Sequence, residues 1–378
     1  MRSFRSPSLL AFALGLGALA ACSSDDFDLT PTSSGTATGG AGGATTSTTT
    51  ATGEQGGGGS TTTTGTGGVG GEEPSGPTKL TIVNGVNDHD AIRVCFMPYP
   101  GGADVDPWPS NEGGLAFAKA IVVDPPTSIA PGDEDIRPHV IAGDLSAIAG
   151  KSCAEILALA ASGSGGAGGS GGAGGGPPSP PPIVAGAMPI LPASVFTSEK
   201  SLLLTFFGCV GGPGKTDGTQ GLGCGFSYTP ETPTASLTLV AMSRKKLPDR
   251  VALQFVHASA AMQPSDMRVT PGYDGQTDVP VVKALGLGGL GPKPPFVALT
   301  RNDYGSLTKV ALKTFAPNDI YATSALFIQD AFVNGGVPDT KFEDGSSFTL
   351  VAIGGYPGAV SQSFWRPFTY TMVASDPE

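Results

Sequence analysis

A glycine-rich segment that ends in lysine and threonine is the first candidate for chemistry. Residues 209–216 read Cys-Val-Gly-Gly-Pro-Gly-Lys-Thr, and glycine-rich loops before Lys-Thr can hold a phosphate through backbone N–H groups. Such a loop needs a glycine five residues before its Gly-Lys pair, and Cys209 stands there instead. We expect no helix after it, because residues 217–221 read Asp-Gly-Thr-Gln-Gly, so the main phosphate donors are missing. We interpret the segment as a turn closed by a disulfide.

The other candidates for a catalytic group are a serine–lysine pair and three histidines. Ser306 and Lys309 fit S-x-x-K, the nucleophile motif of penicillin-recognising enzymes, but the companion S-D-N and K-T-G motifs are missing. We therefore interpret Ser306 as the exposed start of a strand. His89, His139 and His257 are widely separated, which disfavours a Ser-His-Asp triad or a histidine-rich metal site, and His257 is expected to pack or hydrogen-bond within its strand. The sequence predicts no enzyme activity, no cofactor and no metal.

Carboxylates and aromatic rings offer two kinds of binding site. Calcium could be bound by residues 88–90 (Asp-His-Asp), by Asp104 with Asp106, or by residues 133–135 (Asp-Glu-Asp). None of these has a complete set of ligands at calcium-binding spacing, so solvated turns are favoured. A sugar could stack on Trp108 or on Phe364, Trp365 and Tyr370, but packing in a core or at a sheet edge is favoured.

Four cysteines, Cys95, Cys153, Cys209 and Cys224, are available for disulfides in addition to Cys22. An even number in an exported chain favours disulfides, of which three pairings are possible. We favour Cys209–Cys224, which bracket a glycine-rich loop of hairpin length, and then Cys95–Cys153. Cys95 alternates with Ile92, Val94 and Phe96 in its strand, so this bond would attach a helix to the face opposite the core. Zinc bound by four thiolates is the alternative, but no C-x-x-C spacing exists.

The N-terminus carries an export signal. Arg2 and Arg5 precede an apolar stretch over residues 9–19, which is too short to span a bilayer, and residues 19–22 read Leu-Ala-Ala-Cys. This ending resembles the bacterial lipobox, which implies cleavage after residue 21 and lipidation of Cys22. Two or three acyl chains would anchor the chain durably. Ser23 rather than Asp at the next position resembles the sorting signal for the outer membrane.

Composition divides the remaining chain into a tether and a folded part. Residues 22–78 after the signal peptide (1–21) are mostly Gly, Thr, Ser and Ala, which cannot bury enough apolar surface to fold, so we expect a disordered tether. A Gly/Pro-rich insert at 162–182 is expected to be a surface loop. The formal net charge of −11 argues against nucleic acid as a partner.

Short strands between Gly, Pro, Asn and Asp turns predict a mainly β fold of antiparallel sandwiches. Ser152 and Glu155 form a capping box that predicts one short helix, ended by Gly163. Further strands are expected at 201–210, 280–284, 296–300, 307–313, 320–328 and 368–373.

An internal repeat indicates two copies of one module. Strand 80–84 followed by 92–96 matches strand 253–259 followed by 267–269, and residues 236–242 match 347–353 in sequence. The copies are predicted at 79–245 and 250–375, divided at residues 244–248, which read Arg-Lys-Lys-Leu-Pro.

The second copy resembles the bacterial "domain of unknown function 4397" family. Residues 256–259 read Val-His-Ala-Ser and Pro264 follows in the turn, as in that family, whereas the first copy has Asn84-Gly85-Val86 and no proline in its turn. The resemblance implies immunoglobulin-like β-sandwiches on an exported protein and carries no known activity. We therefore expect a lipid-anchored outer-membrane protein, on the periplasmic or cell-surface side, whose modules bind envelope polysaccharide or protein without catalysis. The alternatives are an extracytoplasmic hydrolase with an unrecognised site and a structural spacer.

Overall fold

The computed structural model describes residues 74–130, 133–163, 183–216, 218–262, 265–270, 279–293, 298–299, 311–316, 319–356 and 365–377. The predicted signal peptide, Cys22, the predicted tether up to residue 73, most of the Gly/Pro-rich insert, and Ser306 with Lys309 lie outside these ranges. The described chain is mainly β, with four small sheets and few helices. No helix within these ranges is long and apolar enough to cross a membrane.

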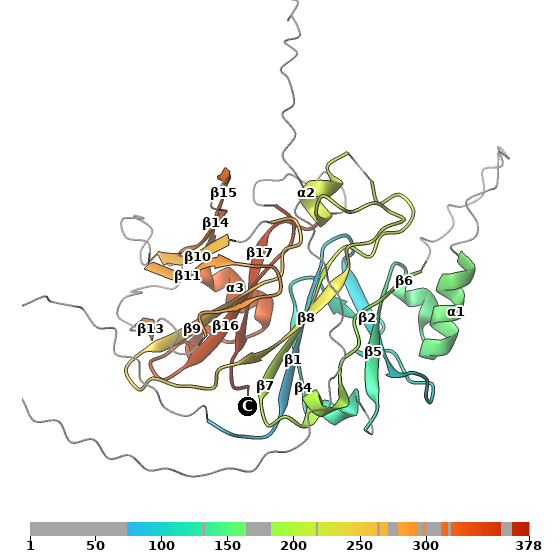
Figure 1. The fold of residues 1–378 in the computed structure, drawn as a ribbon, viewed down its shortest axis with the longest axis horizontal. Helices are drawn as coiled ribbons and strands as arrows, with labels where there is room; N and C mark the ends of the chain where they lie inside the picture. Colours follow the sequence, from blue (N-terminus) through green and yellow to red (C-terminus); the bar gives the residue numbers. More distant parts are fainter. Residues whose placement is uncertain are drawn as a thin grey trace, which may run out of the picture. The chain divides into compact units, whose positions relative to one another are not determined.

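Residues 79–242, which we call the first module, form two sheets (Figure 1). One has the strand order β4-β1-β7-β8 and the other β3-β2-β5-β6. The strands are β1 Lys79–Val86, β2 Ala91–Tyr99, β3 Leu115–Ala116, β4 Ala120–Val123, β5 Asp135–Ala142, β6 Val184–Ala187, β7 Ser201–Gly208 and β8 Ser236–Met242.

Residues 251–374, the second module, form two more sheets, with orders β12-β9-β16-β17 and β11-β10-β14-β15. An additional short strand, β13, pairs with β9. The strands are β9 Val251–His257, β10 Ser265–Thr270, β11 Val279–Leu285, β12 Leu290–Gly291, β13 Ala298–Leu299, β14 Ala311–Ala316, β15 Asp319–Phe327, β16 Ser347–Ile353 and β17 Thr369–Ala374.

The two modules have the same topology. Replacing β1–β8 in order by β9–β12 and β14–β17 converts both strand orders of the first module into those of the second. This correspondence also corrects the sequence match of the late strands: β16 is equivalent to β7, because each runs parallel to the opening strand of its module, whereas β8 is equivalent to β17. These two parallel pairs also correct the expectation of purely antiparallel sheets. The module limits 79–245 and 250–375 stay a prediction.

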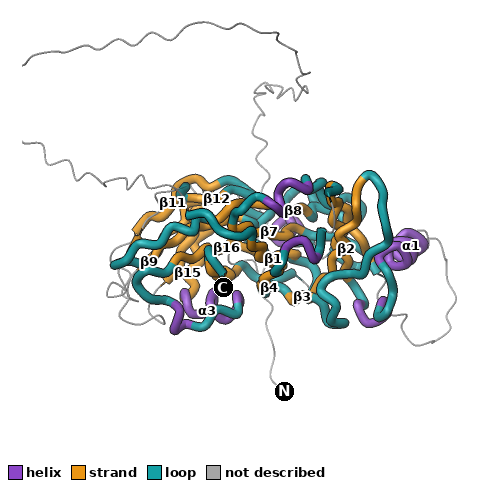
Figure 2. The backbone as a smooth tube through the Cα atoms, turned by 90° about the horizontal axis from the view of Figure 1, so that it is seen from below, coloured by secondary structure: helices purple, strands orange, loops and turns teal. Residues whose placement is uncertain are grey.

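Each module has its own apolar core, and the modules share a third one. Leu80, Leu202 and Leu204 face the core of the first module. Val83 and Leu203, on the opposite faces of the same strands, pack with Val351 and other side chains of β9, β16 and β17 in the shared core. All described residues accordingly belong to one compact unit, and the two groups of strands are visible in Figure 2.

The shared core explains why the central strands are apolar on both faces. Seven of the eight residues of β1, all but Lys79, are buried, as expected for a strand covered on both sides rather than one that alternates between core and solvent. The modules approach closely at Gly85, where a Cβ atom would lie 2.7 Å from Cγ2 of Ile353. A larger side chain at residue 85 would push the modules apart.

The predicted capping box is present at the start of helix α1, Cys153–Gly163. The backbone N–H of Ser152 donates to Glu155 Oε2 at 2.9 Å, and the N–H of Glu155 lies 3.4 Å from Ser152 Oγ. The expectation of a single helix was wrong, since α2 (Gln220–Cys224) and α3 (Ile328–Gly335) are also present.

Helix α3 begins where the strand predicted at 320–328 was to end. Ile328, Ala331 and Phe332 are all buried, and this spacing places one face of a helix, rather than of a strand, against the core. Gly336 then ends the helix in the left-handed conformation, at φ 69°. The predicted strand is present as β15, Asp319–Phe327, and only the helix that follows it was missed.

Both favoured disulfides, Cys95–Cys153 and Cys209–Cys224, are present. Cys95 and Cys153 lie in a separate apolar cluster with Ile156, whereas Val94 and Phe96 face the core of the first module. The bond therefore attaches α1 to the outer face of the sheet, as predicted. Two disulfides suggest that the folded part is extracytoplasmic.

The segment at the predicted module boundary is firmly held. The guanidinium of Arg244, whose side chain is 5% exposed, donates to the carbonyl oxygens of Glu199 and Pro77 and forms an ion pair of 3.3 Å with Asp376. The chain before β1, the segment between the modules and the C-terminus therefore meet at one end of β1 (Figures 1 and 2). The tether would enter the folded unit at this end.

Candidate functional site

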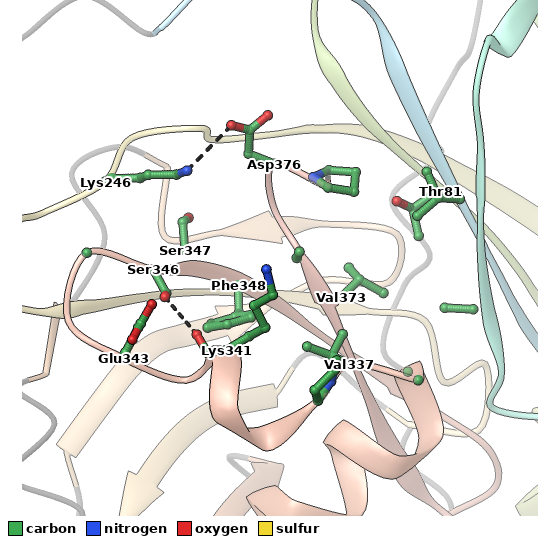
Figure 3. A pocket seen from close by; sticks show the side chains of 18 of the residues that line it. Thr81, Lys246, Val337, Lys341, Glu343, Ser346, Ser347, Phe348, Val373 and Asp376 are labelled. Atoms are coloured by element: carbon green, nitrogen blue, oxygen red, sulfur yellow. Dashed lines mark hydrogen bonds and ion pairs between the residues drawn. The ribbon is translucent and has the colours of Figure 1, made fainter.

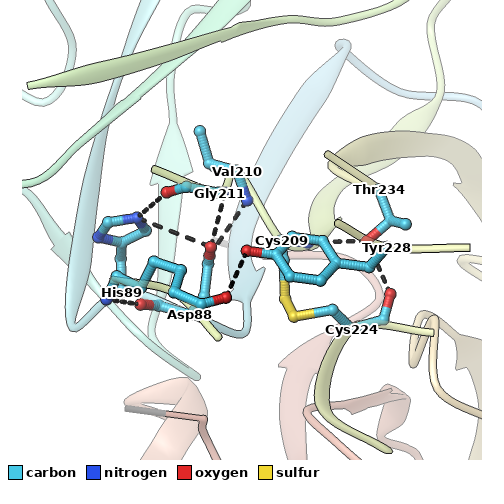
Figure 4. Close-up of polar contacts among 9 residues, drawn as sticks. Asp88, His89, Cys209, Val210, Gly211, Cys224, Tyr228 and Thr234 are labelled. Atoms are coloured by element: carbon cyan, nitrogen blue, oxygen red, sulfur yellow. Dashed lines mark hydrogen bonds and ion pairs between the residues drawn. A yellow bond between two sulfur atoms is a disulfide. The ribbon is translucent and has the colours of Figure 1, made fainter. Parts of the chain in front are cut away.

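The opposite end of β1 carries a cluster of charged side chains. The strand ends at Val86, and Asp88 follows in a turn with its carboxylate completely buried. Asp88 Oδ1 accepts a hydrogen bond of 3.1 Å from the N–H of Val210, and Oδ2 accepts one of 2.7 Å from the N–H of Gly211 (Figure 4). The turn that was considered for calcium is thereby joined to the glycine-rich loop that was considered for phosphate.

The buried carboxylate explains why this loop is not a phosphate-binding loop. Two of its backbone N–H groups, those of Val210 and Gly211, already bind the carboxylate of Asp88. An internal anion thus takes the donors that a phosphate would need. A helix does follow, contrary to expectation, but α2 begins only at Gln220 and has five residues. Phosphate binding is therefore disfavoured by this geometry as well as by the missing glycine.

His89 lies over the same loop and is neutral near pH 7. Its side chain is 10% exposed, and burial lowers its pKa, although Asp88, with Oδ2 3.7 Å from Nε2, acts in the opposite direction. Because Nε2 lies 3.2 Å from the carbonyl oxygen of Gly211, this nitrogen carries the proton and donates it. Nδ1 is then an unprotonated acceptor, and no described residue hydrogen-bonds to it.

Two cations complete the cluster. Lys215 Nζ donates to the backbone carbonyl of Asp88, and burial lowers the pKa of Lys215. Arg366, which comes from the second module, forms an ion pair with Asp90. Its backbone is fixed on both sides, since its N–H donates to Asn87 O at 2.8 Å and its carbonyl accepts from Gly355 N at 3.0 Å. The cluster therefore lies where the two modules meet.

These five charged or titratable residues line an open pocket of about 420 Å³. Glycines 113, 143, 211 and 212 form much of the remaining wall, so backbone groups rather than bulky side chains border the space. Within the described part of the chain, no phenylalanine, tyrosine or tryptophan and no serine, threonine or cysteine lines it. The pocket offers two cations, two carboxylates and one neutral imidazole, which suits the binding of a small polar group.

A rigid layer beneath the loop holds these groups in place. The Cys209–Cys224 disulfide packs with Tyr228 and Trp365 in a buried cluster, in which the two rings meet edge to face at 5.8 Å. The hydroxyl of Tyr228 donates to the carbonyl of Lys215 at 3.1 Å, and Thr234 Oγ1 donates to Cys224 O at 2.7 Å. The disulfide thus positions the lysine by fixing the backbone on which it lies.

Two of the other acidic candidates, Asp104 and Asp135, accept hydrogen bonds from the backbone. Asp104 Oδ1 accepts from the backbone N–H of Ala154 at 2.9 Å, at the start of α1, and Asp135 Oδ1 accepts from Ala193 N at 3.1 Å. No group of three potential metal ligands lies together in the described ranges.

The aromatic candidates pack into the folded unit, as favoured from the sequence. Trp108 meets Phe96 edge to face at 6.2 Å, and Trp365 and Tyr370 are 5% and 1% exposed. Phe364 lies outside the described ranges. A flat platform for a sugar is therefore not formed by Trp365 and Tyr370.

The histidines lie on or beside three different strands. His89 follows β1, His139 lies in β5 and His257 in β9. His257 is completely buried, and its Nδ1 accepts from the N–H of Ser259 at 3.3 Å. The interpretation of His257 as a structural residue is confirmed.

A second hollow of about 470 Å³ lies at the tether end, bordered by β4, β17 and the segment after α3 (Figure 3). Its charged groups are near the solvent: Lys246 and Asp376, 3.8 Å apart, are 58% and 37% exposed. It contains no histidine and no buried charge among its described lining residues. The pocket around Asp88 is the better candidate site because it contains a completely buried carboxylate, that of Asp88, beside a largely buried histidine, His89.

Sequence reasoning missed Arg366 and the junction of the two loops. No local pattern marks Arg366, because its partners Asp90 and Asn87 are far away in the chain and belong to the other module.

Comparison of the chain with known proteins gave no match to a protein-family model or to a curated protein.

Proposed function

We propose that this chain is a lipid-anchored protein of the cell envelope whose two β modules bind a ligand without catalysing a reaction. The proposed anchor is Cys22, in the lipobox-like segment, and Ser23 supports sorting to the outer membrane. The two disulfides support an oxidising compartment. The acidic net charge supports a partner other than nucleic acid.

The observation that carries this proposal is the position of the charged pocket. The chain enters the folded unit beside Arg244 and runs through the eight residues of β1 to the turn that holds Asp88. At roughly 3.3 Å per residue, the pocket lies about 25 Å from the point of entry. An anchor at Cys22 would therefore leave the pocket at the end remote from the attachment, where it is accessible to envelope polymers or proteins.

The finer description of the fold belongs to the same proposal. We infer that both modules are immunoglobulin-like sandwiches related to the "domain of unknown function 4397" family. The identical strand orders of the modules support a tandem duplication, and the Val-His-Ala-Ser segment at residues 256–259 supports the family.

Lipidation is tested by comparing the full chain with the C22A variant in a Gram-negative host that is fed labelled palmitate. We expect label on the full chain and none on C22A. Resistance of residues 79–375 to protease verifies that both proteins are folded. A full chain that is recovered without lipid from the soluble fraction would contradict the anchor. Binding is tested by immobilising the ectodomain and exposing it to isolated envelope polysaccharide, peptidoglycan and envelope protein. If the ectodomain retains none of them, the binding proposal is contradicted and the alternative of a structural spacer is favoured.

A further inference from the structure

The pocket around Asp88 has the composition expected for a site that binds one negative charge together with hydroxyl groups. Arg366 is the main anion-binding group: its Nη2 pairs with Asp90, whereas its Nε is buried and has no hydrogen-bond partner in the described chain. An unsatisfied buried guanidinium N–H is costly, and a planar carboxylate can satisfy it through two parallel hydrogen bonds.

Asp90 would not exclude such a ligand. Its side chain is 83% exposed, so solvent weakens its ion pair with Arg366, and the carboxylate can turn into water at little cost. Lys215, which also lines the pocket, adds a second positive charge close to the incoming group. An incoming anion therefore replaces one weak surface partner and gains the attraction of two cations.

The remaining groups favour a monoanion that carries hydroxyls over a phosphate. Two cations and two carboxylates nearly cancel, so a dianion would face the buried charge of Asp88, and the backbone N–H groups suited to phosphate are occupied by that carboxylate. The unprotonated Nδ1 of His89 can accept a hydrogen bond from a hydroxyl. A space of about 420 Å³ is within the range of small-molecule sites.

We propose that this pocket binds a hexuronate unit of an acidic polysaccharide, with the carboxylate on Arg366 near Lys215 and a ring hydroxyl on Nδ1 of His89. This assignment rests on the proposed binding function and names its ligand class. Because no phenylalanine, tyrosine or tryptophan lines the described pocket, recognition depends on charge and hydrogen bonds, and it should weaken as the salt concentration rises.

The test is calorimetric titration of the ectodomain with a galacturonate tetramer and, as the neutral control, a galactose tetramer. We expect the acidic oligomer alone to bind, R366Q to bind at least tenfold more weakly, and D90N to bind several-fold more tightly, because the competing carboxylate is removed. R250Q is the matched control: Arg250 also forms an exposed pair with an aspartate, Asp249, and its loss should leave the affinity unchanged. Circular dichroism verifies that each variant folds.

Three results would overturn the assignment: equal binding of the neutral oligomer, unchanged affinity in R366Q, or no binding of the acidic oligomer at millimolar concentration. None of these would affect the lipid anchor or the capture of another envelope polymer, which are measured separately. Failure of the ligand assignment is thus distinguishable from failure of the proposed function.

Discussion

Substitution of Leu203 by alanine tests whether the two modules form one unit in solution. Leu203 is completely buried, and its side chain lies in the core that β7 shares with the second module. Its neighbour Leu204 is equally buried but faces the core of the first module. Removing a buried leucine side chain costs about 2–5 kcal/mol when the surroundings cannot collapse. We therefore expect L203A and L204A to lower the free energy of unfolding by similar amounts in this range.

The assay is urea unfolding of the ectodomain, combined with calorimetry. L159A serves as the exposed control, since Leu159 is 43% exposed on α1, and its cost should stay below about 0.5 kcal/mol. We expect one calorimetric transition, because the unfolding of either module would expose the other module's side of the shared core to water. The reasoning is refuted if L203A behaves like L159A while L204A is strongly destabilised, because the shared core would then be absent in solution.

Two further predictions concern the region around the pocket. Replacing Cys209 and Cys224 together by serine opens a 15-residue loop, which should lower the free energy of unfolding by about 3 kcal/mol; an unchanged melting temperature would argue against the bond. Burial lowers the pKa of His89 and of His139, so between the ordinary value of about 6.5 and the lowered value only the unfolded chain is protonated. The free energy of unfolding should therefore be highest above pH 6.5 and decrease as the pH falls below this value. The urea midpoint should fall less between pH 7.5 and pH 5 in H89Q than in the unsubstituted chain, and equal decreases would contradict this assignment.

Local patterns in the sequence predicted local features of the fold. The capping box at Ser152 and the alternation around Cys95 predicted a helix and the face to which it is attached, because both depend on residues that are close in the chain. The same reasoning did not predict strand β5. It also missed the shared core, because the sequence of a strand does not reveal what packs against each of its faces. It also paired the late strands incorrectly, because residues 236–242 are more similar in sequence to 347–353 than the topologically equivalent 201–208 are.

The candidate site was predictable in its parts but not as a whole. Residues 88–90 and 209–216 were each singled out for ligand chemistry, and each was interpreted as a turn. Their junction depends on the parallel pairing of β1 with β7, which brings Val86 opposite Gly208 and places the following turns side by side. Arg366 depends on the packing of one module against the other. Tertiary pairing, rather than any motif, assembles the pocket.

The pairing of β1 also determines how the protein would bear a mechanical load. The strand lies between β4 and β7, and its ladder with β7 extends over all eight residues, from Lys79 to Val86. If the chain is anchored and binds a ligand as proposed, tension would pull at Lys79 along the strand axis, against the ligand at the far end. The hydrogen bonds to both neighbouring strands would then be loaded in shear and would have to break together rather than one after another. A strand in this position can transmit a pulling force from one end of the module to the other without being peeled from its sheet.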